Sequence, residues 1–98
     1  MSSSYRRGRI AERKVMNRLE ELGYHNISRT KGSRGPYDIY ARSPRGIKTY
    51  VQVKSGSARL GTVDIERLRT VAYERRGTAV TVERRKGKNR FKFWGSWY

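Results

Sequence analysis

The chain has 98 residues and a formal net charge of +16, from 24 Lys and Arg residues against 8 Asp and Glu. This length suits one domain with one core, which we expect to span residues 1–98. The absence of cysteine excludes disulfides and thiolate metal sites, and the single His25 cannot form a His-rich zinc site. Because 17 of the basic residues are Arg, whose planar fork suits phosphate, the composition indicates a nucleic-acid partner.

The chain contains no run that reads as a signal peptide or a membrane-spanning helix, which predicts a cytoplasmic protein without a membrane partner. Residues 1–7 form a basic lead that we expect to be loosely ordered. Apolar residues at helical spacing predict a helix from about Gly8 to Leu22, ended by Gly23. A second helix is expected from Thr62, as its N-cap, to about Gly77. The predicted strands are Tyr24–Thr30, Pro36–Tyr40, Tyr50–Lys54, Thr78–Arg84 and Asn89–Trp97. The element order α-β-β-β-α-β-β predicts an α/β domain, a small mixed β-sheet flanked by helices.

The second and third predicted strands form a hairpin that carries the candidate chemistry. Side chains alternate along a strand, so Gln52 and Lys54 point one way while the neighbouring valines point into the core. If pairing brings Asp38 beside them, a carboxylate, an amide carbonyl and an ammonium converge, as metal-assisted phosphodiester cleavage requires. On this pattern alone, the polar outer face of an amphipathic hairpin is the simpler interpretation. Glu12, at the border of the first helix's apolar stripe, is equally explained as a first-turn acid favoured by the helix dipole.

Together, several short segments resemble the archaeal-type Holliday junction resolvases of the PD-(D/E)XK, or restriction-endonuclease-like, nuclease superfamily. The resemblance covers roughly residues 5 to 55 in register and the element order beyond them. Its motifs are Tyr5–Gly8, Ala11–Arg13, Leu19–Tyr24, Ser28–Ser33, Asp38 and Val51–Lys54. Each motif alone is weak, whereas the combination is specific.

The resemblance implies a metal-dependent endonuclease that hydrolyses phosphodiester bonds of branched DNA in recombination and repair, with Mg²⁺ or Mn²⁺ as cofactor. It implies a catalytic set of Glu12, Asp38, Gln52 and Lys54, in which the first three are metal ligands and the lysine orients the attacking water. The DNA-binding residues that we expect are Arg6, Arg7, Arg13, Arg29, Lys31, Ser33 and Arg34. Taken singly, each of these is also explained as a generic phosphate contact or a turn residue.

Gln52 is a departure, because the family usually carries an acid at this position. A glutamine carbonyl can still coordinate Mg²⁺ but brings no charge, so weaker metal binding is expected. Mrr-like restriction nucleases are built around a QxK motif, so Gln52 does not by itself indicate an inactive site. Two alternatives therefore stay open: a Mrr-like or restriction-type nuclease acting on other DNA, and a non-catalytic basic DNA-binding module with a degenerate site.

The aromatic C-terminal tail bears on assembly. A resolvase cuts two strands symmetrically, which a twofold homodimer accomplishes most simply. Strand alternation predicts that Phe91 and Phe93 are buried, and leaves Trp94, Trp97 and Tyr98 as a surplus that can anchor a dimer interface. The alternative is that these aromatic residues fill the far side of the sheet under the second helix.

Overall fold

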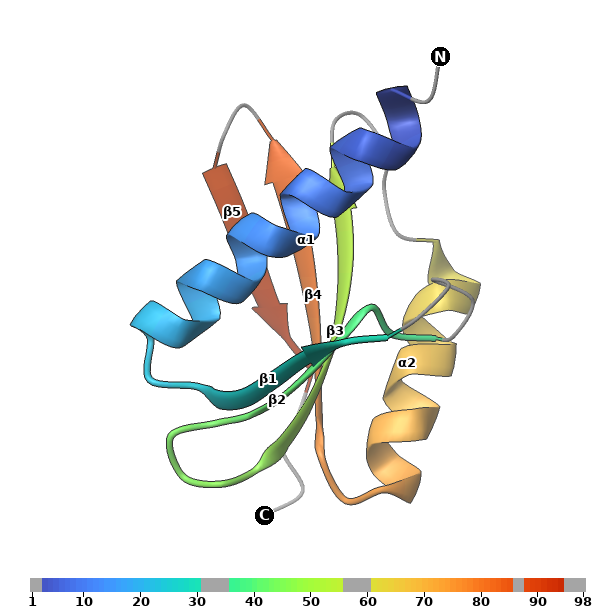
Figure 1. Ribbon diagram of the computed structural model, residues 1–98. Helices are drawn as coiled ribbons and strands as arrows, with labels where there is room; N and C mark the ends of the chain where they lie inside the picture. Colours follow the sequence, from blue (N-terminus) through green and yellow to red (C-terminus); the bar gives the residue numbers. More distant parts are fainter. Residues whose placement is uncertain (1–2, 31–35, 56–60, 86–87, 95–98) are drawn as a thin grey trace.

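A computed structural model describes residues 3–30, 36–55, 61–85 and 88–94, with side chains from residue 9 onward. Its elements are α1 (Ser3–Glu21), β1 (His25–Arg29), β2 (Ile39–Arg42), β3 (Lys48–Ser55), α2 (Thr62–Glu74), β4 (Thr78–Arg85) and β5 (Lys88–Phe93) (Figure 1). The predicted order of elements is confirmed. The helix α1 begins at Ser3, earlier than the predicted Gly8, so the described part of the basic lead is helical.

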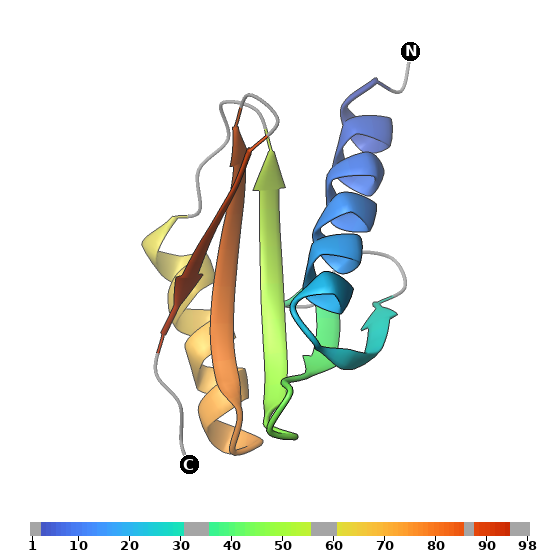
Figure 2. The same cartoon turned by 90° about the vertical axis from the view of Figure 1, so that its left-hand side faces the viewer.

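The five strands form one mixed sheet in the order β1-β2-β3-β4-β5. The pair β3 and β4 is parallel, and the other three neighbouring pairs are antiparallel. Parallel neighbours need a crossover connection, which α2 supplies. The two helices cover opposite faces of the sheet, as the edge-on view in Figure 2 shows. Among the described residues, no helix is long and apolar enough to cross a membrane.

Each helix packs on its own hydrophobic cluster. The cluster under α1 contains Ala11, Val15 and Leu19 from the helix and Ile39, Val51, Val53, Val80 and Val82 from the sheet. The cluster under α2 contains Tyr50, Leu68, Ala72 and Ala79. Since side chains alternate across a strand, the valines of β3 face α1 and leave the intervening residues on the α2 face. The predicted inward direction of Val51 and Val53 is confirmed.

The two ends of α2 differ from the prediction. Gly61 occupies the N-cap position, and Thr62, predicted as the cap, is the first residue of the helix. After the helix, Gly77 closes the connection to β4, and a Cβ atom there would lie 2.5 Å from the main-chain oxygen of Lys48. This glycine is therefore required by the close approach of the crossover to β3.

The C-terminal aromatic residues are not arranged as alternation predicted. Phe91 packs against the cluster under α1, but Phe93 is 52% exposed, so its predicted burial is wrong. It belongs to β5, an edge strand of the sheet. Trp94 packs against the α2 cluster instead, as the alternative interpretation expected. Trp97 and Tyr98 lie outside the described residues.

Candidate active site

Asp38 lies directly before β2 and is held by the neighbouring strand β3. Its Oδ2 atom accepts a hydrogen bond of 2.9 Å from the main-chain N–H of Val53. Its own N–H donates to the main-chain oxygen of Val51 at 2.8 Å. With 6% of its surface exposed, Asp38 is a buried carboxylate whose orientation is fixed from the main chain of β3. The hairpin predicted from the sequence provides this anchor.

Gln52 and Lys54 belong to β3 and lie beside Asp38. Ile39 pairs with Val51 in the antiparallel register, so the next position places Asp38 opposite Gln52. By strand alternation, Lys54 is on the same face as Gln52, and both side chains are half-buried. The charge of Lys54 lowers the pKa of Asp38, although less than burial raises it. The hairpin thus brings an acid, an amide and an ammonium to one end of the sheet.

Glu12 approaches this cluster from α1. The helix has no acidic residue in its first turn, so the helix-dipole interpretation of Glu12 does not apply. Glu12 is 8% exposed, and its Oε1 atom lies 3.9 Å from the Nε atom of Arg29 on β1. That distance is at the limit of an ion pair, so Arg29 only partly compensates the buried charge.

The two carboxylates, Glu12 and Asp38, are coupled electrostatically. Burial raises the pKa of Glu12 above its ordinary value of 4.5, and the charge of Asp38 raises it further, while Arg29 and Arg9 lower it. Burial also raises the pKa of Asp38, with the Val53 N–H and Lys54 acting in the opposite direction. Two carboxylates held together away from water favour protonation or a cation between them.

The donor atoms of this cluster fit a hard divalent cation. Two carboxylates and one amide carbonyl offer only oxygen, which Mg²⁺ and Mn²⁺ prefer. Within the residues that the structure describes, no group of three His, Cys, Asp or Glu could hold a metal ion. A cation at Glu12 and Asp38 would therefore need Gln52, solvent or substrate oxygens to complete its coordination.

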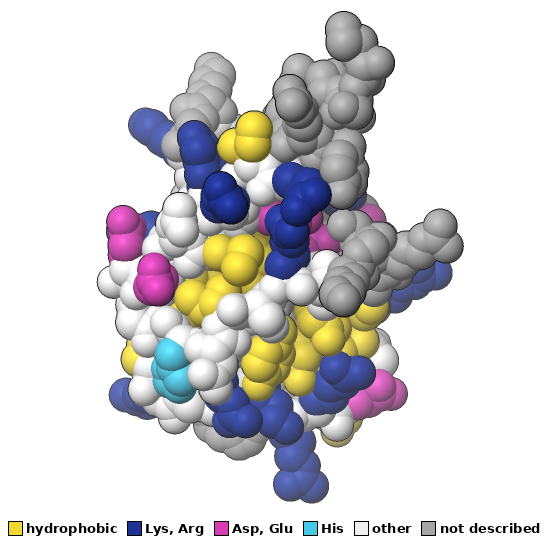
Figure 3. Space-filling model, in the orientation of Figure 1, with side chains coloured by type: hydrophobic (Ala, Val, Ile, Leu, Met, Phe, Trp, Pro, Cys, Tyr) yellow, Lys and Arg dark blue, Asp and Glu magenta, His cyan; other side chains and the backbone are white. Residues whose placement is uncertain are grey.

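A basic hollow of about 240 Å³ adjoins Glu12 and is lined by Arg9, Ile10, Arg13 and Arg29. Lys and Arg side chains gather beside acidic ones over α1 on the face shown in Figure 3. Arg13 and Arg29 were predicted to bind DNA, and the structure brings them together. Sequence reasoning missed Arg9, although its i, i+4 spacing from Arg13 places the two on one helix face.

The side chains of the other predicted DNA-binding residues lie outside the described part of the structure. The backbone of Arg6 and Arg7 is helical, and their side chains lie outside the description. Lys31, Ser33 and Arg34 lie between β1 and β2, outside the described residues. Their contact with DNA remains a prediction.

The burial of Glu12 predicts that the stability of the protein falls as pH rises. Because the folded-state pKa of Glu12 is raised, its stabilising contribution is complete below the unfolded pKa near 4.5 and is lost as pH rises through the folded value. We expect Glu12→Gln to raise the melting temperature at pH 7 by a few degrees (roughly 4–8 °C per kcal/mol in a domain of this size). The difference from wild type should disappear by about pH 4. Calorimetry in the presence of EDTA measures the melting temperatures of the two proteins at each pH.

The matched control is Glu20→Gln, which alters an exposed acid on the same helix. It should leave the melting temperature nearly unchanged at both pH values. A Glu12→Gln protein that is less stable than wild type at pH 7 would show that the buried charge is fully compensated.

Comparisons with known proteins identify a family and a related fold. A family model of the Mrr catalytic domain, described as a restriction endonuclease, matches residues 8–85. Among solved structures, the chain is similar to Hjc, a Holliday junction resolvase from the archaeal hyperthermophile Archaeoglobus fulgidus. The TM-score is 0.66 at 23% identity, covering 85% of this chain and 71% of that one, which is a likeness of fold. No curated protein sequence matches the chain significantly.

Proposed function

Since this chain belongs to the restriction endonuclease family, we propose that it is a divalent-metal-dependent endonuclease that hydrolyses phosphodiester bonds of branched DNA. The proposal is supported by the burial and electrostatic coupling of Glu12 and Asp38, together with the register that puts Asp38 opposite Gln52 and the effect of the Lys54 charge on Asp38. The fold shared with the archaeal resolvase supports the branched substrate. Mg²⁺ is the expected cofactor, and Mn²⁺ can replace it.

In this mechanism the basic side chains bind the scissile phosphate and its neighbours, and the acidic side chains bind the metal. Glu12, Asp38 and the amide oxygen of Gln52 would hold the cation, which supplies Lewis-acid stabilisation of the phosphoryl oxygens when bound. Lys54 orients the attacking water and stabilises the negative charge that develops on the phosphate. Arg13 and Arg29 contact neighbouring phosphate oxygens from the other side of Glu12, where their hollow opens.

A second candidate is a Mrr-like nuclease that acts on other DNA. The match to the Mrr catalytic domain and the glutamine at position 52 favour it. Both candidates use the same acids and lysine, so the substrate distinguishes them. The deciding experiment compares Mg²⁺-dependent cleavage of a labelled four-way junction with that of a linear duplex of the same sequence. Preference for the junction supports a resolvase, and equal cleavage supports the Mrr-like function. Binding without cleavage in either metal would leave only a DNA-binding module.

We further propose that the active form is a homodimer, because two symmetric cuts need two identical sites. The exposed Phe93 at the edge of the sheet, stacked on Phe91 with ring centroids 6.5 Å apart, offers apolar area for such an interface. Sedimentation at micromolar concentration, with and without junction DNA, tests this assembly. A monomer under both conditions would exclude it.

Gln52→Glu is predicted to preserve or raise activity. The substitution adds a third carboxylate beside Asp38, so a divalent cation should bind more tightly. We expect the Mg²⁺ concentration for half-maximal cleavage to fall by about tenfold, since one added charge contributes on the order of 1.4 kcal/mol. Titration of Mg²⁺ in a cleavage assay measures the change. Without metal the variant should melt at a lower temperature than wild type, because the added charge repels the two buried acids.

A further inference from the structure

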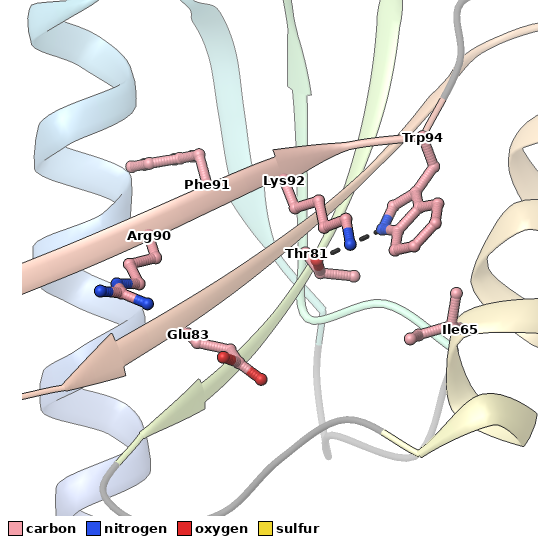
Figure 4. Close-up of a pocket in the computed structure, with 7 residues that line it drawn as sticks. All are labelled: Ile65, Thr81, Glu83, Arg90, Phe91, Lys92 and Trp94. Carbon is pink, nitrogen blue, oxygen red and sulfur yellow. Dashed lines mark hydrogen bonds between the residues drawn. The ribbon is translucent and has the colours of Figure 1, made fainter.

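A second hollow lies on the face of the sheet covered by α2 (Figure 4). Its volume is about 360 Å³, and it lies between Ile65 of α2 and the last two strands. Its other lining residues are Thr81 and Glu83 of β4, Arg90, Phe91 and Lys92 of β5, and Trp94 directly after β5. Phe91 points to the opposite side, toward α1, so the cations of β5 alternate onto this face.

The strand register connects this hollow directly to the candidate active site. Gln52 pairs with Thr81, and Lys54 pairs with Glu83, across the parallel strands β3 and β4. Thr81 pairs in turn with Lys92, and Glu83 with Arg90, across β4 and β5. Paired residues on neighbouring strands share a face of the sheet. Two rows therefore cross the sheet from the proposed catalytic residues to two cations: Gln52–Thr81–Lys92 and Lys54–Glu83–Arg90.

The distal end of the first row holds positive charge against an aromatic ring. The Nζ atom of Lys92 lies 4.6 Å from the centre of the Trp94 ring, and the guanidinium of Arg69 lies 5.5 Å from it. The indole N–H of Trp94 donates to the Thr81 hydroxyl at 3.3 Å, which anchors the ring to β4. A cation held against an anchored ring loses less conformational entropy when it binds an anion.

Glu83, the acid that lines this hollow, is itself paired. Its Oε1 atom lies 3.6 Å from the Nε atom of Arg85. The pair offsets the charge that would otherwise repel a phosphate between Lys54 and Arg90. Across the two rows and the residues that touch them, cations therefore outnumber acids, as they do in the whole chain.

We propose that these rows form a binding track for the sugar-phosphate backbone of the DNA beyond the scissile phosphate, with Arg90 and Lys92 as its distal phosphate contacts. The proposal rests on the proposed function, which puts the scissile phosphate at Lys54. Two strand spacings of about 4.8 Å separate β3 from β5, so the track extends about 10 Å. Successive phosphates are at least the axial rise of about 3.4 Å apart, so the distal contact falls within about three phosphates of the cut.

The first test measures DNA binding in an Asp38→Asn background, in which cleavage does not interfere. The double variant Arg90→Gln/Lys92→Gln should bind a four-way junction about tenfold more weakly for each lost contact. The slope of log affinity against log salt should fall by about 0.9 for each phosphate released. The matched control, Arg45→Gln/Lys48→Gln, removes the same charge at the opposite end of β3. It should change both quantities much less. Equal effects of the two double variants would overturn the track.

The second test locates the contact by a double-mutant cycle. Single neutral methylphosphonate linkages replace each phosphate within about four positions of the branch point. At the contacted phosphate, the replacement should weaken binding of the parent protein but not of Arg90→Gln/Lys92→Gln. Additive effects at every position would overturn the track. If the wild type cleaves the junction but no methylphosphonate position couples to Arg90→Gln/Lys92→Gln, the binding track is rejected and the nuclease proposal is retained. Coupling without Mg²⁺-dependent cleavage would retain the track and reject the nuclease.

Discussion

Asp38→Asn should abolish cleavage, by about a thousandfold or more, while DNA binding is retained. The carboxylate is 6% exposed and is oriented by the Val53 N–H, so an asparagine can keep the hydrogen bond while losing the charge. Loss of one negative charge also reduces repulsion toward phosphate, so affinity for DNA should be unchanged or slightly higher. Single-turnover cleavage and equilibrium binding of the same junction measure the two effects.

Metal binding gives a readout that does not depend on turnover. A cation that binds only the folded state raises its stability, by about 2.7 kcal/mol at a hundred times its dissociation constant. Mg²⁺ should therefore raise the melting temperature of the wild type and have little effect on Asp38→Asn. The control Asp64→Asn removes an exposed acid from the first turn of α2 and should behave as wild type in every assay. Cleavage by Asp38→Asn at the wild-type rate would exclude the nuclease mechanism.

Lys54→Ala should lower the cleavage rate by about a hundred- to ten-thousandfold. The ammonium lies on the face of Gln52, and its charge already acts on Asp38. Without it, the negative charge that develops on the phosphate loses a counterion. Lys54→Arg is expected to restore little activity, because a planar guanidinium cannot take the place of a compact ammonium.

The Lys54→Ala variant separates catalysis from metal binding. Since lysine is not a ligand, Lys54→Ala should keep the Mg²⁺-dependent rise in melting temperature that Asp38→Asn loses. Lys48→Ala is the matched control, because Lys48 is half-buried at the other end of the same strand. Should the two lysine variants cleave at the same rate, Lys54 would have no special role.

The parts of the site that the sequence predicts are those encoded locally. Alternation along β3 places Gln52 and Lys54 on one face, and a short turn pairs that strand with β2 beside Asp38. The position of Glu12 came from its place on the helix and from the family resemblance. The buried environment that raises its pKa depends on how α1 docks on the sheet, and no local pattern determines that docking.

The errors arise where distant elements decide the outcome. Alternation predicted burial for Phe93, but this residue lies on an edge strand, which has only one neighbouring strand in the sheet, and is exposed. The row from Lys54 to Arg90 was not predicted either, because it needs the registers of two strand pairs that no short window contains. Trp94, which the sequence left as a surplus aromatic residue, packs against the cluster under α2, and this contact also joins elements that are distant in the sequence.

The hydrogen bond from Val53 to Asp38 links chemistry to correct folding. Its donor is a main-chain group, so the orientation of the carboxylate depends on the alignment of β2 with β3 rather than on any one side chain. A slip of one residue would turn Val51 and Val53 toward the wrong face and remove the donor from Asp38 in the same step. A misaligned molecule would lose its core and the orientation of Asp38 together. The hairpin therefore couples the packing of the core to the placement of the proposed catalytic acid, because both depend on the same register.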